Sequence, residues 1–138
     1  MLASPFYCPG VDDLDFWIGE WTCTDASDGS IGTNSISRVL SEKVVEERFH
    51  IVDAAGQELN GRSWSVHDPQ RGWLQTWVDD QGTYLDFTGR TTADGFVFAR
   101  DRQRMVFRDV ARDSFTWDWE RRADAGWRLA WRLHYQRR

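Results

Sequence analysis

Apolar and polar residues alternate through most of this chain, with the period of two that is typical of β-strands with one buried face. The last stretch is the clearest example. Trp127, Leu129, Trp131, Leu133 and Tyr135 fall on one face, and the residues between them are mostly polar. We therefore predict a strand whose ring-bearing face points inward, with all five of these side chains buried.

Turn signals made of Gly, Asp and Pro separate such stretches at intervals of roughly eight to twelve residues, which is typical of an all-β meander. The predicted strands cover residues 20–24, 31–40, 44–52, 59–67, 73–78, 84–90, 96–101, 105–110, 115–122 and 127–136. About ten strands favour a closed antiparallel up-and-down barrel, because closure removes the exposed edges of a flat sheet.

The first nineteen residues break this pattern and predict an irregular lead-in with a short helical cap. Leu14, Trp17 and Ile18 have helical spacing behind Asp12 and Asp13, which are residues suited to a helix start. No linker composition interrupts the rest, so residues 1–138 are predicted to form a single domain.

Rings are concentrated on the predicted inner faces. Six of the nine tryptophans fall in pairs two or four residues apart: Trp73 and Trp77, Trp117 and Trp119, Trp127 and Trp131. The same alternation places Phe115 inward with Trp117 and Trp119, and places Phe49 inward on the strand of residues 44–52. Such a surface is either an unusually aromatic core or the wall of a ligand cavity.

Several polar residues share the inner faces by the same alternation. Glu47 falls on the face of Phe49, and Gln75 falls between the tryptophans of its strand. We predict that Tyr84 and Asp86 follow inward on the next strand. A buried carboxylate needs a partner, and Arg100, two residues beyond Phe98, is the predicted inward cation for Glu47.

Composition limits the remaining classes. Two cysteines, Cys8 and Cys23, are too few for a disulfide framework, and no signal-peptide pattern opens the chain, so we expect a cytoplasmic location. No apolar run approaches the roughly 20 residues of a membrane span. Residues 100–138 carry 11 arginines against 6 acids, but these alternate with rings and acids. We interpret them as a solvated sheet face and expect no nucleic-acid partner.

Catalytic and metal chemistry has little support in the sequence. His50, His67 and His134 lie on different predicted strands, with His50 and His134 outward, so no metal site is predicted. We expect no cofactor; a haem held by one axial histidine is the alternative. Cys23 is interpreted as a small inward filler. Glu47 and Asp86 would act as acid and base if both faced one cavity, or would be structural hydrogen-bond partners.

Residues 15–21 and residues 60–79 contain motifs that resemble those of a family of small bacterial lipocalin-like proteins of unknown function. Residues 15–21 (DFWIGEW) are similar to its F-D-F-W-x-G-x-W opening, with Leu14 in place of the first Phe. Residues 60–79 are similar to its G-x-S-x-x-x-x-D-P-x-x-G-x-W-x-Q-x-W-V-D block, and Tyr135 with Arg137 fits its aromatic-x-Arg ending. The resemblance covers much of the chain.

Gly19 to Trp21 also resembles the G-x-W of the first lipocalin strand. There the tryptophan closes the barrel floor and an arginine of the last strand packs on it, a role that Arg137 or Arg132 would take here. The resemblance implies a calycin-type barrel with a central cavity. It implies no reaction, since a fold does not determine a function.

The leading hypothesis is a barrel that binds a small apolar or aromatic ligand. The expected site residues are Trp21, Glu47, Phe49, Gln75, Trp77, Tyr84, Arg100, Trp117, Trp119 and Trp131. The alternatives are an isomerase, cyclase or hydratase that uses Glu47 and Asp86, a haem-binding barrel, and an interaction protein that forms a homodimer through a sheet face or rim.

Overall fold

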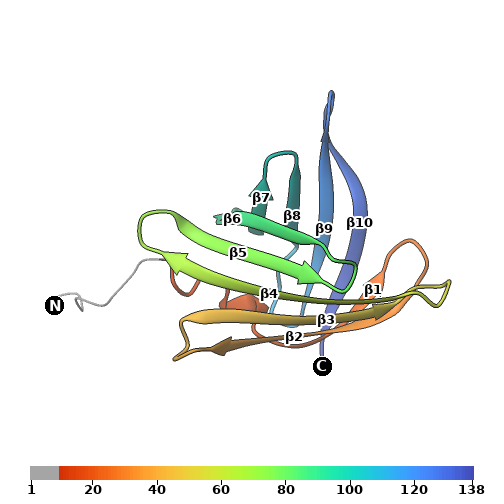
Figure 1. Ribbon diagram of the computed structural model, residues 1–138, viewed down its shortest axis with the longest axis horizontal. Coiled ribbons are helices and arrows are strands. Elements are labelled where there is room, and N and C mark those ends of the chain that lie inside the picture. Colours follow the sequence, from red (N-terminus) through yellow and green to blue (C-terminus); the bar gives the residue numbers. More distant parts are fainter. Residues whose placement is uncertain (1–9) are drawn as a thin grey trace, which may run out of the picture.

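A computed structural model describes residues 10–138 as a closed barrel of ten antiparallel strands with one short 3-10 helix before them (Figure 1). The elements are η1 (Asp15–Trp17), β1 (Gly19–Asp25), β2 (Ile31–Val39), β3 (Val44–Val52), β4 (Glu58–Asp68), β5 (Gly72–Asp79), β6 (Tyr84–Thr92), β7 (Gly95–Arg100), β8 (Gln103–Arg108), β9 (Ser114–Ala123) and β10 (Gly126–Arg137). Each strand pairs with its neighbours in sequence, and β1 pairs with β10 to close the ring. The predicted all-β, lipocalin-like up-and-down barrel is confirmed.

The 3-10 helix closes one end of the barrel. It lies where the helical cap was predicted, and both Trp17 at its end and Leu14 directly before it are buried. The greater part of the predicted irregular lead-in, with Cys8, lies outside the described residues. None of the helical structure in residues 10–138 is long and apolar enough to cross a bilayer.

Arg137 clamps this closed end. Its guanidinium carbon lies 4.2 Å from the ring centroid of Trp21, within the range of a cation–π contact. The same group donates hydrogen bonds to the carbonyl oxygens of Ile18 at 2.8 Å and Phe16 at 3.3 Å. Of the two arginines considered for this position, Arg137 takes it, whereas Arg132 faces outward. The last strand thereby fastens the helix over the core.

The β2–β3 turn achieves a left-handed backbone without glycine. Leu40, Ser41 and Glu42 have φ values of 51°, 58° and 64° in succession. Such values are unfavourable for residues with a Cβ. Two contacts hold the turn: the Lys43 amide donates to the Leu40 carbonyl at 3.2 Å, and Arg38 donates to the Glu42 carbonyl at 3.5 Å.

A register shift in β10 changes which side chains are buried. Leu129 lies opposite Glu120, but Trp131 lies opposite Trp119, so one extra residue stands between the two pairs. Because side chains alternate, this bulge reverses the faces of the strand. Trp127 and Leu129 therefore point outward, and the prediction that they are buried inside is wrong.

Two observations fix these outward positions. The guanidinium of Arg104 stacks over the ring of Trp127, 4.2 Å from its centroid, and Leu129 is 45% exposed. Trp127 and Leu129 belong to the β9–β10 hairpin, which projects beyond the neighbouring strands (Figure 1). Beyond the bulge, the predicted burial of Leu133 and Tyr135 is confirmed.

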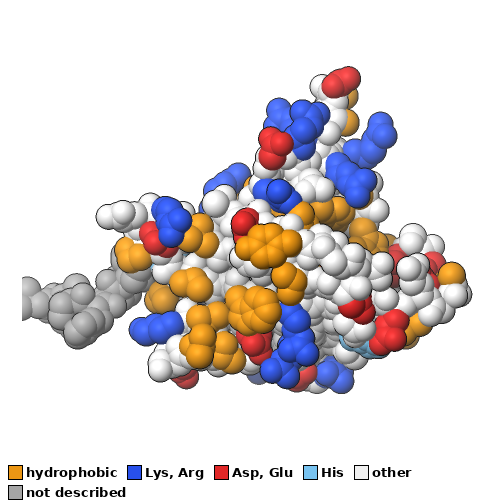
Figure 2. Space-filling model, viewed as in Figure 1, with side chains coloured by type: hydrophobic (Ala, Val, Ile, Leu, Met, Phe, Trp, Pro, Cys, Tyr) orange, Lys and Arg blue, Asp and Glu red, His pale blue; other side chains and the backbone are white. Residues whose placement is uncertain are grey.

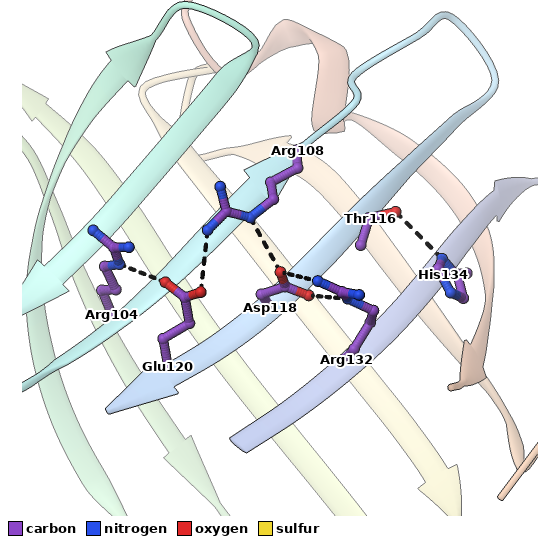
Figure 3. A network of polar contacts seen from close by, with 7 residues as sticks. All are labelled: Arg104, Arg108, Thr116, Asp118, Glu120, Arg132 and His134. Atoms are coloured by element: carbon purple, nitrogen blue, oxygen red, sulfur yellow. Dashed lines mark hydrogen bonds and ion pairs between the residues drawn. The ribbon is translucent and has the colours of Figure 1, made fainter. Parts of the chain in front are cut away.

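The outer face of β8, β9 and β10 carries a network of arginines and carboxylates (Figure 3). Asp118 accepts two hydrogen bonds from Arg132, at 2.7 and 2.9 Å, and one from Arg108 at 3.1 Å. Glu120 accepts from Arg104 at 2.6 Å and from Arg108 at 3.1 Å. The arginines are paired with acids on an outer sheet face, as the alternation predicted.

Asp118 is buried although it lies on this outer face. Burial alone would raise the pKa of its carboxyl, but the hydrogen bonds and charges of Arg132 and Arg108 outweigh burial and hold the pKa below its usual value. The carboxylate is consequently charged at neutral pH and joins the two arginines.

A different part of the outer surface is apolar. Figure 2 shows apolar side chains gathered over β4, β5 and β6, where Trp64, Val66 and Tyr84 are 37%, 43% and 64% exposed. The indole of Trp64 donates a 3.0 Å hydrogen bond to Glu46, which holds its ring against the sheet. A homodimer through a sheet face or rim stays a prediction.

Candidate functional site

The barrel interior holds a cavity of about 310 Å³. This volume lies at the lower end of the range of roughly 300–1,000 Å³ that small-molecule sites occupy. Trp17 contributes from η1, and the other lining side chains come from β3, β4, β5, β6, β8, β9, β10 and the β5–β6 turn. The inner rings therefore leave room between them.

Four tryptophans form much of the wall, namely Trp77, Trp117, Trp119 and Trp131. Trp117 and Trp131 meet edge to face, with centroids 5.5 Å apart and planes at 89°. Two indoles are also fixed through their nitrogens: Trp131 donates to Asp25 at 2.7 Å and Trp77 donates to Asp79 at 2.9 Å. The rings are thus held in place before any ligand enters, and the site is pre-formed.

Gly61 on β4 determines where the Trp77 ring can lie. A Cβ atom at Gly61 would collide with the six-membered ring of Trp77. The absence of a side chain at Gly61 leaves the space that this ring occupies against β4. One glycine therefore helps to keep the cavity open.

Glu47 lies in the buried part of the site. Its carboxylate accepts hydrogen bonds from Asn34 Nδ2 and from Ser63 Oγ, each at 2.7 Å. Asn34 also donates to the hydroxyl of Tyr135 at 2.9 Å. Burial raises the pKa of Glu47, and the two hydrogen bonds oppose this effect without overcoming it. The group therefore holds its proton to a higher pH than an exposed glutamate does.

The polar partners of Glu47 differ from the predicted one. Arg100 does not line the cavity, because β7 ends at this residue and it lies at the β7–β8 turn. The neighbours of Glu47 come from β2 and β4 instead, and Ser63 lies directly across from it in the sheet. The predicted ion pair between Glu47 and Arg100 is therefore wrong.

Most of the predicted site residues do meet around the cavity. They are Glu47, Phe49, Gln75, Trp77, Trp117, Trp119 and Trp131. Trp21 is an exception: its ring is buried between Phe115, 4.8 Å away, and Arg137, so it belongs to the closed end and not to the cavity.

Tyr84 and Asp86 lie outside the barrel, so their predicted inward position is wrong. The β5–β6 pairing places Trp77 opposite Leu85, and alternation then puts Leu85 and Phe87 inside. Tyr84 is 64% exposed, and Asp86 accepts a 2.8 Å hydrogen bond from Thr76 on the outer face. Glu47 and Asp86 therefore share no cavity, and the proposed acid–base pair does not form.

Several cavity residues were missed from the sequence. They include Trp17, Leu85, Phe87, Met105 and Arg121. The sequence did hold a signal for Leu85 and Phe87, since they are the apolar members of their alternating stretch. Alternation also held a signal for Arg121, which follows Trp117 and Trp119 on the same face of β9, whereas Trp17 lies on η1, before the strands begin.

Among the described residues, no cysteine or histidine side chain lines the cavity. Cys23 is buried, and burial raises the pKa of its thiol to about 12, although a hydrogen bond with Tyr135 lowers it. Its predicted role as a buried filler is confirmed. His50 and His134 bond to the outer-face residues Asn60 and Thr116, at 2.8 and 3.2 Å.

His67 packs against the ring of Trp73, with centroids 5.3 Å apart. Among residues 10–138, no histidine lines the cavity and no three metal-ligating side chains lie together. The geometry consequently offers a haem no axial histidine inside the barrel.

Comparison with known proteins assigns the chain to no group. No protein-family model matches it, and a search of curated proteins finds no match either.

Proposed function

We propose that this barrel binds a small, mainly apolar or aromatic molecule in its cavity. The observation that carries the proposal is the open volume of about 310 Å³ between side chains that are themselves fixed by hydrogen bonds and ring contacts. A pre-ordered wall loses little conformational entropy when a ligand arrives, so apolar burial contributes more fully to affinity.

The lining is suited to such a ligand. Apolar and aromatic side chains make up most of it, and the polar groups are few. Glu47 and Gln75 lie in the buried region, while Asp79 and Arg121 come from strand ends near turns. This arrangement of an apolar body with a few polar groups is typical of small-molecule sites.

We also propose membership of the small bacterial lipocalin-like family, on the basis of residues 15–21 and 60–79. The stacking of Arg137 on Trp21 supports this proposal, because the resemblance implied such a pair. A cytoplasmic location is proposed from the low cysteine content alone.

The test of ligand binding uses N-phenyl-1-naphthylamine, a neutral apolar dye whose fluorescence increases in apolar surroundings. We expect saturable binding with a Kd on the order of micromolar. Leu85→Trp and Leu59→Trp each add a large ring to the lining and are expected to weaken binding at least about tenfold. Leu129→Trp is the matched control, because Leu129 points outward.

Circular dichroism and native-state tryptophan emission establish that each variant is folded before titration. The proposal is wrong if the dye does not bind saturably to the wild-type protein. It is equally wrong if the folded lining variants and the Leu129 control bind the dye with the affinity of the wild type.

A further inference from the structure

Two buried polar atoms of the cavity lining have no hydrogen-bond partner in the described part of the chain. They are the indole nitrogen of Trp17, a donor, and the amide oxygen of Gln75, an acceptor. Trp17 is 2% exposed and Gln75 is 3% exposed. A polar atom that is buried without a partner is unfavourable, so a ligand that pairs with both atoms relieves that penalty.

Neighbouring contacts hold both groups in place. The amide nitrogen of Gln75 donates to Ser65 Oγ at 3.0 Å, which leaves its oxygen as the free end. The ring of Trp17 packs edge to face on Phe107, with centroids 5.4 Å apart, and its backbone carbonyl accepts a 2.8 Å hydrogen bond from Trp21. Each group is therefore held in place and leaves one polar atom, a donor on Trp17 and an acceptor on Gln75, without a partner.

The charged and polar side chains that line the cavity are unfavourable for a ligand with an anionic group. Glu47 lines the same cavity and receives its hydrogen bonds from the neutral groups of Asn34 and Ser63. The one arginine among the lining residues is Arg121, which lies near the far end of β9. A ligand carboxylate near Gln75 would share the cavity with the carboxyl of Glu47 and meet the unpaired amide oxygen of Gln75, which is unfavourable in a buried site.

We infer that the cavity selects neutral apolar molecules that carry a hydroxyl group, such as phenols and compact apolar alcohols. The hydroxyl oxygen accepts a hydrogen bond from Trp17, the hydroxyl proton is donated to Gln75, and the apolar body lies among the tryptophans. A hydroxyl is the simplest neutral group that offers both a donor and an acceptor. The inference rests on the proposed function, since it names the ligand class of the same cavity.

Four probes with one ring system separate the relevant interactions: 2-naphthol, 2-methoxynaphthalene, naphthalene and 2-naphthoate. Isothermal titration calorimetry at pH 7 avoids their optical overlap with tryptophan. We expect 2-naphthol to bind roughly five- to tenfold more tightly than naphthalene and 2-methoxynaphthalene, the gain of about one good hydrogen bond. The anion 2-naphthoate should bind most weakly.

Variants connect the preference to the two atoms. Gln75→Leu and Trp17→Phe should each reduce the naphthol-to-naphthalene affinity ratio toward one, without loss of naphthalene binding. Gln57→Leu is the matched control, because Gln57 is exposed before the start of β4 and does not line the cavity. That variant should keep the wild-type ratio.

The outcomes distinguish the two proposals. If no probe and no dye binds, the proposed function itself fails. If naphthalene or 2-methoxynaphthalene binds as tightly as 2-naphthol, ligand binding stands and the hydroxyl preference is overturned. The same conclusion follows if Gln75→Leu and Gln57→Leu change the ratio equally, or if 2-naphthoate binds best.

Discussion

Replacement of Glu47 by glutamine should change how the stability of the barrel depends on pH. Glutamine has nearly the same volume as glutamate and can keep both hydrogen bonds: its oxygen accepts from Asn34, and its nitrogen donates to the hydroxyl of Ser63. The substitution therefore removes a titrating group with little other disturbance. Below pH 4.5 the carboxyl of Glu47 is mainly protonated in both the folded and the unfolded wild-type protein. There we expect the free energies of unfolding of Glu47→Gln and the wild type to agree within about 1 kcal/mol.

The sign of the effect at higher pH follows from the raised pKa of Glu47. An unfolded glutamate loses its proton near its ordinary pKa of 4.5, whereas the folded protein keeps the proton until the raised pKa is reached. Between these values the folded state binds more protons, so the free energy of unfolding falls as the pH rises. For one proton the slope is at most about 1.36 kcal/mol per pH unit.

In Glu47→Gln the free energy of unfolding no longer falls with rising pH for this reason. The stability of the variant relative to the wild type should therefore increase from pH 4.5 upward and become constant above the folded pKa of Glu47. Urea unfolding at closely spaced pH values from 4 to 8, followed by tryptophan fluorescence, gives the difference directly. Carboxyls that have lowered pKa values, such as Asp118, titrate alike in both proteins and cancel in the comparison.

Glu42→Gln provides the control for charge. Glu42 is an exposed residue of the β2–β3 turn, so the same charge is removed without burial. Its stability difference from the wild type should change little over the same pH range. A constant offset between Glu47→Gln and the wild type from pH 4 to 8 would refute the reasoning, since it would mean that burial does not shift this carboxyl.

Three further changes test the contacts that hold the fold. Asp118→Asn should lower the free energy of unfolding by about 1–3 kcal/mol at pH 7. This is less than for a fully buried pair, because Arg108 and Arg132 are 34% and 40% exposed. An unchanged free energy of unfolding in urea would contradict a stabilising role of the network. Arg137→Lys should cost about 1–3 kcal/mol, because an ammonium cannot both stack on Trp21 and donate to two carbonyls, and an unchanged melting temperature would exclude this clamp. Gly61→Ala should cost about 1–3 kcal/mol by displacing the Trp77 ring, and Trp77→Leu in the same chain should recover part of that loss; additive effects in the double-mutant cycle would disprove the contact.

Local alternation predicted much of the fold, because successive side chains of a regular strand point to opposite faces and the apolar set identifies the buried face. In β9, Phe115, Trp117 and Trp119 lie inside as predicted, since this strand alternates without interruption through them. The hydrogen-bond partners of Glu47 could not be predicted from the sequence, for a physical reason. Asn34 and Ser63 belong to neighbouring strands, and which residue stands beside another across a sheet depends on the turns and the pairing register.

The tryptophan pairs show where alternation stops being informative. Trp127 and Trp131 are four residues apart, a spacing that would place them on one face of a regular strand. The bulge between Leu129 and Trp131 separates them instead, and each indole then finds a different partner. Trp131 lines the cavity and bonds to Asp25, whereas Trp127 lies outside beneath the guanidinium of Arg104. A bulge leaves no mark in the hydrophobic pattern when both sides of it are apolar. The two indoles of this pair therefore serve different surfaces, the wall of the cavity and the outer face of the projecting hairpin, and only the register of β10 distinguishes them.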